Sequence, residues 1–234
     1  GKSLLALLIT FMVFLVGVMF HLTIGLPPQA PILQINESKI ILAETKASDL
    51  MEAGFDIYVR QGDGSSDYED LLTDGSFQKY SGNKTVTIEK GFRLDSNAVP
   101  YAPYLLAKDG IVLGSVTFYS SEEQSLVLED SKVIQIHFNK ESIEAAKSHS
   151  ISLRLNELDL LGKLDLDTVT SNFDKHLWSS PPTSPSDTSQ LWYGLNWSTN
   201  SDHLFWNEYY SIIRLDEDYQ MIDFEFAAQI ARDQ

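Results

Sequence analysis

The chain has 234 residues, no cysteine and a formal net charge of −16, from 33 acidic and 17 basic residues. The absence of cysteine excludes disulfides, thiol catalysis and thiolate metal sites. The acidic balance disfavours nucleic acid and anionic lipid headgroups as partners, because both are polyanions. Solubility alone accounts for this balance and is the favoured interpretation, with a cationic peptide or metal ion as the alternative partner.

The first residues are apolar enough to cross a membrane. Residues 4–26 carry no charge, and a helix of that length spans about 34 Å, which suffices for the hydrocarbon core. Lys2 before it predicts a cytoplasmic N-terminus under the positive-inside rule. A cleaved signal peptide is the alternative, but its apolar run is usually shorter and no A-x-A-like site follows here. We therefore expect residues 1–26 to be a retained single-pass anchor in the cell membrane, with the main domain extracytoplasmic.

Small and polar residues of the anchor fall on one side of the predicted helix, within an arc of about 100°. Such stripes let helix backbones approach closely, and an intramembrane histidine normally faces protein. The pattern predicts packing against an integral membrane protein, with a chance arrangement in a lone anchor as the alternative. The stripe consists of Ser3, Ala6, Thr10, Gly17, His21 and Gly25.

An anchored domain without cysteine is more typical of a bacterial surface protein, and of a Gram-positive one, than of a eukaryotic secreted domain. Three N-x-S/T sequons begin at Asn36, Asn83 and Asn196. Glycosylation would matter only if the bacterial interpretation is wrong.

Beyond the anchor, one pattern occurs twice: a short helix followed by strands of alternating polarity. This predicts an α+β fold with two small units, each a short helix or helix pair on an antiparallel sheet. The predicted divisions are an extended Pro-containing spacer at 27–38, a first unit at 39–140, a helical linker at 141–149 and a second unit at 150–234.

In the first unit we expect a strand at 40–42 and a short helix within 45–55, capped by Thr45 or Ser48 and ended by Gly54. The pair Asp109-Gly110 predicts a tight hairpin turn. Residues 61–82 are rich in Gly, Ser and Asp and predict a long loop. The predicted strands of this unit are 85–89, 104–108, 111–119 and 133–138.

In the second unit, strict alternation predicts a strand at 151–155. A helix is expected within 162–173, capped by Asp165 or Asp167. Acidic residues 216–218 mark a turn, and the Pro/Ser/Thr-rich segment 179–189 is expected to be exposed. The predicted strands that follow the helix are 191–197, 204–215 and 221–226.

The stretch 162–173 resembles the opening of small bacterial domains of the β-lactamase-inhibitor-protein and BamE-like (SmpA/OmlA) type. It departs from that pattern at Asp165, where Thr or Ser is usual, and at Asp174, where Gly is expected. Residues 42–55 look like an element of Firmicutes surface proteins that ends in Ala-Gly-Phe. The resemblance covers about a dozen residues per unit and implies a binding or scaffolding module, because members of this fold are generally not enzymes.

Motifs of catalysis or of metal and cofactor binding are absent from the sequence: no histidine pair has metal-ligand spacing, and no nucleophile-elbow, Walker or Rossmann pattern occurs. Asp63, Ser65, Asp67 and Asp74 match four positions of a calcium loop. However, Tyr68 stands where that loop needs glycine, so a solvated loop is favoured. We expect no cofactor, no metal site and no enzymatic activity.

Aromatic residues are concentrated between positions 178 and 210. Alternation along strands places some on each face, so either they fill the interface between sheet and helix or some form an exposed surface for a partner. The candidate partner surface consists of Trp178, Trp192, Tyr193, Trp197, Trp206, Tyr209 and Tyr210.

These observations favour a non-enzymatic accessory subunit of a membrane complex, such as a transporter or secretion system, docked through its transmembrane helix. The alternative is a free-standing surface receptor that binds a peptide or polymer through the aromatic sheet. A hydrolase using Asp165 and Asp167 is the weakest hypothesis, because residues two apart on a helix do not face each other.

Overall fold

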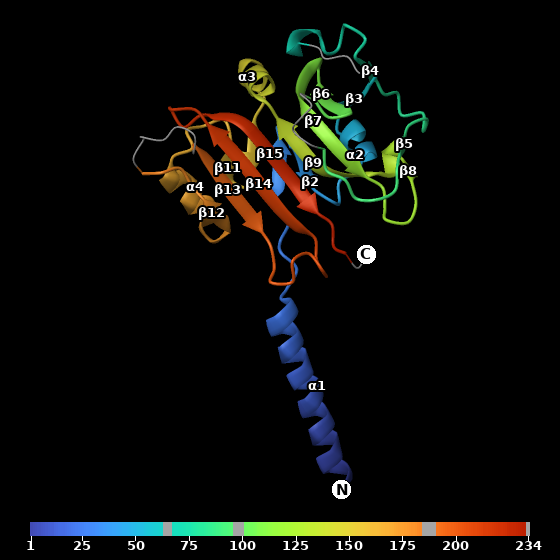
Figure 1. Ribbon diagram of the computed structural model, residues 1–234, viewed down its shortest axis with the longest axis vertical. Helices are drawn as coiled ribbons and strands as arrows, with labels where there is room; N and C mark the ends of the chain where they lie inside the picture. Colours follow the sequence, from blue (N-terminus) through green and yellow to red (C-terminus); the bar gives the residue numbers. More distant parts are fainter. Residues whose placement is uncertain (63–66, 96–100, 184–190, 233–234) are drawn as a thin grey trace.

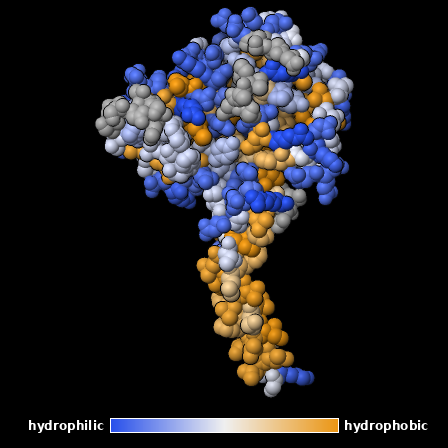
Figure 2. All heavy atoms as spheres, in the orientation of Figure 1, coloured by the Kyte–Doolittle hydropathy of each residue, from blue (hydrophilic) through white to orange (hydrophobic). Residues whose placement is uncertain are grey.

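The computed structural model describes residues 1–62, 67–95, 101–183 and 191–232. A long helix, α1 (Lys2–Ile24), stands apart from the rest of the chain, which forms one rounded body at the end of that helix (Figure 1). The helix is long and apolar enough to cross a membrane, and its most apolar stretch has no buried residue. The apolar surface in Figure 2 is accordingly concentrated along it.

An antiparallel sheet of nine strands is the main element of the body (Figure 1). Its strand order is β12-β13-β14-β15-β9-β7-β6-β3-β4. In that order the strands are β12 (Leu177–Ser179), β13 (Trp192–Trp197), β14 (Glu208–Leu215), β15 (Met221–Gln229), β9 (Lys132–Phe138), β7 (Ile111–Tyr119), β6 (Tyr104–Lys108), β3 (Asp56–Arg60) and β4 (Phe77–Lys79).

Two smaller sheets complete the strands of the described chain. One has the order β11-β10-β1-β2, with β1 (Ile32–Ile35), β2 (Ser38–Ile41), β10 (Leu153–Leu155) and β11 (Leu158–Asp159). The other pairs β5 (Thr87–Ile88) with β8 (Leu126–Val127). Three short 3-10 turns lie at Tyr68–Asp70 (η1), Leu128–Asp130 (η2) and Asp174–His176 (η3).

The main core lies on one face of the large sheet, and a smaller buried cluster that includes Leu105 and Val112 lies on the other face. The helices α2 (Ala47–Glu52), α3 (Lys140–Ser148) and α4 (Leu166–Phe173) pack on the main core together with the inner face of the four-stranded sheet. Alternation along the strands sends Tyr193, Ile213 and Phe224 into the main core, because side chains two apart share a face. The opposite face carries polar residues such as His137 and Glu225, which are cross-strand neighbours.

The expected α+β class and the single N-terminal apolar helix are confirmed, but the expected pair of small units is not. β9 of the predicted first unit pairs with β15 of the second, so one sheet extends across the predicted boundary. β1 and β10 likewise pair across it, which places residues 32–35 of the predicted spacer inside a sheet. One contiguous core cluster contains residues of both halves, including Phe138 and Phe224, whose rings stack at 5.4 Å.

Most local expectations match the structure. The Asp109-Gly110 turn joins β6 to β7, with φ of 51° and 77° at these two residues. α4 begins after Asp165, whose Oδ1 accepts a hydrogen bond from the Thr168 backbone N–H at 2.9 Å. α2 differs, because it begins after Lys46, and the Asp49 carboxylate accepts the Lys46 backbone N–H.

Other local expectations do not hold. The predicted loop 61–82 contains η1 and strand β4, which pairs with β3. Strand β14 begins only at Glu208, because residues 198–207 form a loop between β13 and β14. Most of the Pro/Ser/Thr-rich segment, residues 184–189, lies outside the described residues.

Candidate functional site

A groove of about 690 Å³ opens between the chain leaving α1, the four-stranded sheet and the edge of the large sheet. Three segments far apart in the sequence line it: residues 28–39, 156–157 and 175–198. Its polar lining consists mainly of the side chains of Gln29, Gln34, Lys39, Asn156, Glu157, Lys175, His176 and Asn196.

The β1–β10 pairing brings the first two of these segments together. Gln34 lies opposite Arg154 in this ladder, and the Asn156 Oδ1 accepts a hydrogen bond from the Ile32 backbone N–H at 2.8 Å. Asn156 has a φ of 49°, a left-handed conformation that asparagine tolerates better than most residues. The amide therefore fixes the turn after β10 against the start of β1.

Trp178 on β12 forms an aromatic platform at the groove. Its side chain is 58% exposed, although one side of the indole lies directly on Gly194 of β13. A Cβ added to Gly194 would lie 2.4 Å from Trp178 Cε2, so no other residue fits beneath the indole. The Trp192 ring packs edge-on against it at 5.2 Å. The indole is thus supported from below and beside, with its outer face free.

His176 and Trp197 form a rigid part of the groove. The centroids of these two rings lie 5.0 Å apart in a stacked arrangement. On α4, the Phe173 ring packs edge-on against Trp197, with the centroids 5.7 Å apart. The His176 Nδ1 lies 3.1 Å from the Asn196 carbonyl oxygen, which can only accept, so Nδ1 carries the proton. Burial, together with the nearby Lys175 charge, lowers the pKa of His176, so this imidazole is neutral at pH 7.

The groove is locally basic on an acidic protein. Lys39 and Lys175 line it against one carboxylate, Glu157, whereas the whole chain has 33 acidic and 17 basic residues. Amide side chains supply both donors and acceptors beside these cations. The arrangement suits a polar ligand with many hydroxyl groups, and it favours an acidic substituent over a basic one.

The structure divides the predicted aromatic surface. Tyr193, Trp197 and Tyr209 are buried in the core, with at most 6% of each exposed, because they lie on the inward-facing positions of β13 and β14. Their burial keeps these three side chains out of an exposed aromatic surface, although Trp197 still lines the groove. Trp192, Trp206 and Tyr210 are half-buried, and Trp178 is the exposed member of the set. The Lys and amide residues of the groove carry no local sequence signal, since long-range pairing assembles them.

The predicted stripe lies along α1 as expected from its spacing, with Gly25 just after the helix end. The Thr10 hydroxyl donates to the Ala6 carbonyl oxygen at 2.9 Å, which satisfies it within the helix. Ser3, Ala6, Thr10, Gly17 and His21 are exposed, so no described part of the chain covers them. Packing of this stripe against another protein stays a prediction.

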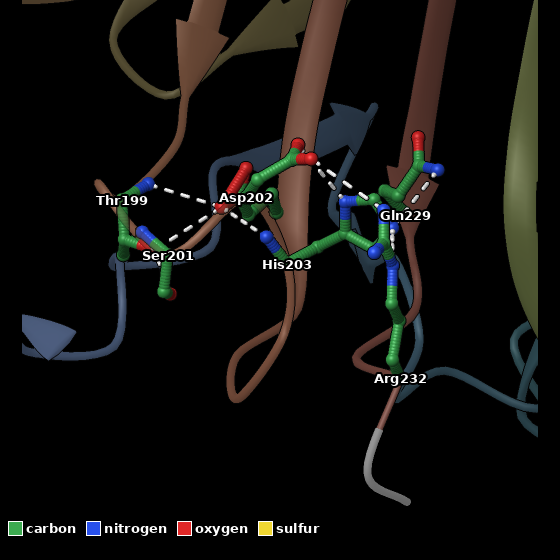
Figure 3. A network of polar contacts seen from close by, with 7 residues as sticks. Thr199, Ser201, Asp202, His203, Gln229 and Arg232 are labelled. Atoms are coloured by element: carbon green, nitrogen blue, oxygen red, sulfur yellow. Dashed lines mark hydrogen bonds and ion pairs between the residues drawn. The ribbon is translucent and has the colours of Figure 1, made fainter.

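Asp202, His203 and Glu208 bring their ligand atoms within 4.8 Å of one another at the β13–β14 loop. Their hydrogen bonds favour a structural network over a cation site (Figure 3). The Arg232 Nε donates to His203 Nε2 at 3.0 Å, which sets a guanidinium charge where a metal would bind. The Glu208 Oε1 already accepts the backbone N–H groups of His203 and Thr199, at 2.7 and 3.2 Å.

Other predicted acidic sites have structural roles or fall outside the described chain. Asp63 and Ser65 of the calcium-like loop are not among the described residues. Asp74 accepts the Ser76 backbone N–H at 2.8 Å. Asp165 caps α4, and the hydrogen bond from Thr168 lowers the pKa of this carboxyl group.

No protein-family model matches this chain, and no curated protein or solved structure matches it.

Proposed function

We propose that this protein is a membrane-tethered, non-enzymatic binding protein whose groove takes a saccharide, as a free sugar chain or as part of a surface polymer. The observation that carries this proposal is the exposed Trp178 indole, held on Gly194 beside amide and lysine side chains. The proposal is a specific form of the surface receptor for a peptide or polymer that the sequence suggested as the alternative to an accessory subunit.

The chemistry of the groove favours a sugar over a peptide. An aromatic face carries partial negative charge and attracts the slightly positive C–H groups on one face of a sugar ring. The amides of Gln34, Asn156 and Asn196 can then pair with its hydroxyl groups. A peptide would instead be anchored by side chains in apolar pockets.

The groove also lies beside the anchor. Pro28 and Ala30, which line it, follow α1 after only a few residues. With α1 in a membrane and the body outside the cytoplasm, the groove would sit next to the outer surface of the bilayer. We propose that the ligand is a cell-surface polysaccharide close to a bacterial membrane.

Binding measurements on the full chain in nanodiscs test this proposal. The probes are a neutral polysaccharide, an acidic polysaccharide and a cationic peptide, and isothermal titration calorimetry gives the affinities. Trp178→Ala should weaken saccharide binding at least about tenfold, a loss of about 1.4 kcal/mol. Gly194→Ala should weaken it too, because the added Cβ displaces the indole.

The matched charge variants are Lys175→Ala in the groove and Lys147→Ala on the exposed face of α3. We expect the first to weaken binding of the acidic polysaccharide and the second to leave it unchanged. Equal affinities of wild type and Trp178→Ala for every saccharide would contradict the proposal. Binding of the peptide alone would show that the ligand class is wrong.

A second candidate function is an accessory subunit of a membrane complex, supported by the uncovered stripe on α1. Replacing Thr10 and Gly17 with Leu would fill the stripe and separate the helix backbones. Purification in mild detergent at native expression should then lose a stoichiometric partner that Val16→Leu, a control outside the stripe on the same helix, retains. Recovery of the same complex from the stripe variant would exclude docking through this face.

A further inference from the structure

The loop between β13 and β14, residues 198–207, lies at the end of the body from which α1 emerges (Figure 1). Its tip contains three consecutive large apolar residues, Leu204, Phe205 and Trp206. Leu204 is 37% exposed, and the apolar surface of α1 continues onto this underside of the body (Figure 2).

The tip contacts α1 itself. The Phe205 and Phe20 ring centroids lie 6.4 Å apart, tilted by 51°. Phe20 precedes the last helical residue, Ile24, by about one turn, so it lies about 6 Å below the helix end. The tip therefore packs against the last turn of the apolar helix.

The loop holds this position through the polar network of Figure 3. Asp202 and His203 both have left-handed backbone conformations, with φ of 49° and 47°. Such conformations cost free energy and persist only where the surrounding structure holds them. Glu208 accepts the His203 N–H, and the His203 carbonyl oxygen accepts the Arg232 N–H at 3.0 Å. The network thus ties the loop to β14 and to the chain after β15, directly behind the apolar tip.

We infer that this tip is a second membrane contact: Leu204 and Phe205 enter the interfacial layer of the bilayer that α1 crosses, whereas the neighbouring Trp206 is half-buried with its indole Nε1 covered. The inference rests on the membrane span in the proposed function, but not on the saccharide. Aromatic residues concentrate at that layer, where an apolar ring meets the headgroups. Two attachment points would fix the tilt of the body, whereas a helix alone leaves the body free to rotate on its connection.

Lipid is favoured over a protein partner as the occupant. A stable protein interface buries about 800 Å² on each side, which three tip residues do not supply. Continuity with α1 also places the tip at bilayer level whenever the helix spans. The net charge of −16 argues for neutral lipids, so the contact is apolar in origin.

Single-cysteine labelling of the full chain tests this inference, because the sequence has no cysteine of its own. Leu204→Cys, Val13→Cys and Glu144→Cys each receive an environment-sensitive fluorophore. Glu144 is exposed on α3, at the end of the body away from α1 (Figure 1). The proteins are reconstituted into phosphatidylcholine vesicles with brominated acyl chains, either near the glycerol or near the bilayer centre.

We expect loss of fluorescence at position 204 with bromine near the glycerol, at position 13 with bromine near the centre, and at neither depth for position 144. Adding Phe205→Asp to Leu204→Cys should reduce the loss at 204, because a carboxylate disfavours insertion. Quenching at 13 without quenching at 204 would overturn the membrane contact and leave the anchor intact. Absence of quenching at 13 would overturn both the anchor and this contact, whereas saccharide binding is measured separately.

Discussion

At the scale of single side chains, several residues adopt their positions only because a particular partner residue allows it. Trp178 can lie flat on the sheet because Gly194 has no side chain, and neither position signals this in the sequence. His137 and Asp223 form a second pair, on the polar face of the large sheet, with Nε2 and Oδ2 2.8 Å apart. Glu225 and Arg214 also act on this histidine.

The His137–Asp223 pair makes stability depend on pH. Burial lowers the pKa of His137, but the hydrogen bond and charge of Asp223, with Glu225, outweigh burial and raise the pKa above its ordinary value. A raised pKa stabilises the folded state fully below the unfolded pKa of about 6.5, and this contribution is lost as pH rises through the folded value. We expect His137→Gln to lower the free energy of unfolding more at pH 5.5 than at pH 9.

Urea denaturation of the full chain in detergent at both pH values checks this prediction. Asp223→Asn should remove the same pH-dependent part, and the double variant should lose no more of it than either single variant. An equal loss of stability at pH 5.5 and pH 9 would show that the pair does not stabilise the charged imidazole.

At the scale of elements, local chemistry predicts those with a strong local signal. Asp109-Gly110 adopts the positive φ values that a tight hairpin turn needs, so β6 and β7 lie at the predicted residues. Asp165 caps α4 because its carboxylate reaches the Thr168 N–H. Strand β4 has only three residues, too few for an alternating pattern to predict it from the sequence. It forms because β3 offers a free edge to pair with.

The same distinction applies to the candidate site. Trp178 belonged to the predicted aromatic surface and is exposed, and its contact with a partner stays a prediction. Tyr193 and Trp197 belonged to it as well, but strand register directs them inward. Lys39, Asn156 and Lys175 were not predicted, because they meet only where β1 pairs with β10 beside β12.

At the scale of the whole molecule, the β9–β15 ladder joins the two halves of the body. Phe224 stacks on Phe138 across this ladder, and both side chains are fully buried. A sheet and core shared in this way predict one cooperative unfolding unit.

Phe224→Ala tests this cooperativity. The variant should lower the opening free energy by about 3–5 kcal/mol, the usual cost of a deleted buried phenylalanine. We expect the same decrease at the amides of β6 and β7 as at those of β13 and β14, measured by hydrogen exchange with mass spectrometry. Unchanged protection of β6 and β7 would support two independent units, and Glu144→Ala on the surface serves as the control.

Short-range properties of the chain were sufficient to predict the apolar helix, the α+β class and the hairpin at Asp109-Gly110. Hydropathy and turn preferences act between neighbouring residues, so they can be read from the sequence. The single nine-stranded sheet, the groove beside the anchor and the contact between Phe20 and Phe205 needed the folded structure. Each depends on pairing between residues distant in sequence, and alternation reveals which face of a strand is apolar without revealing its neighbouring strand.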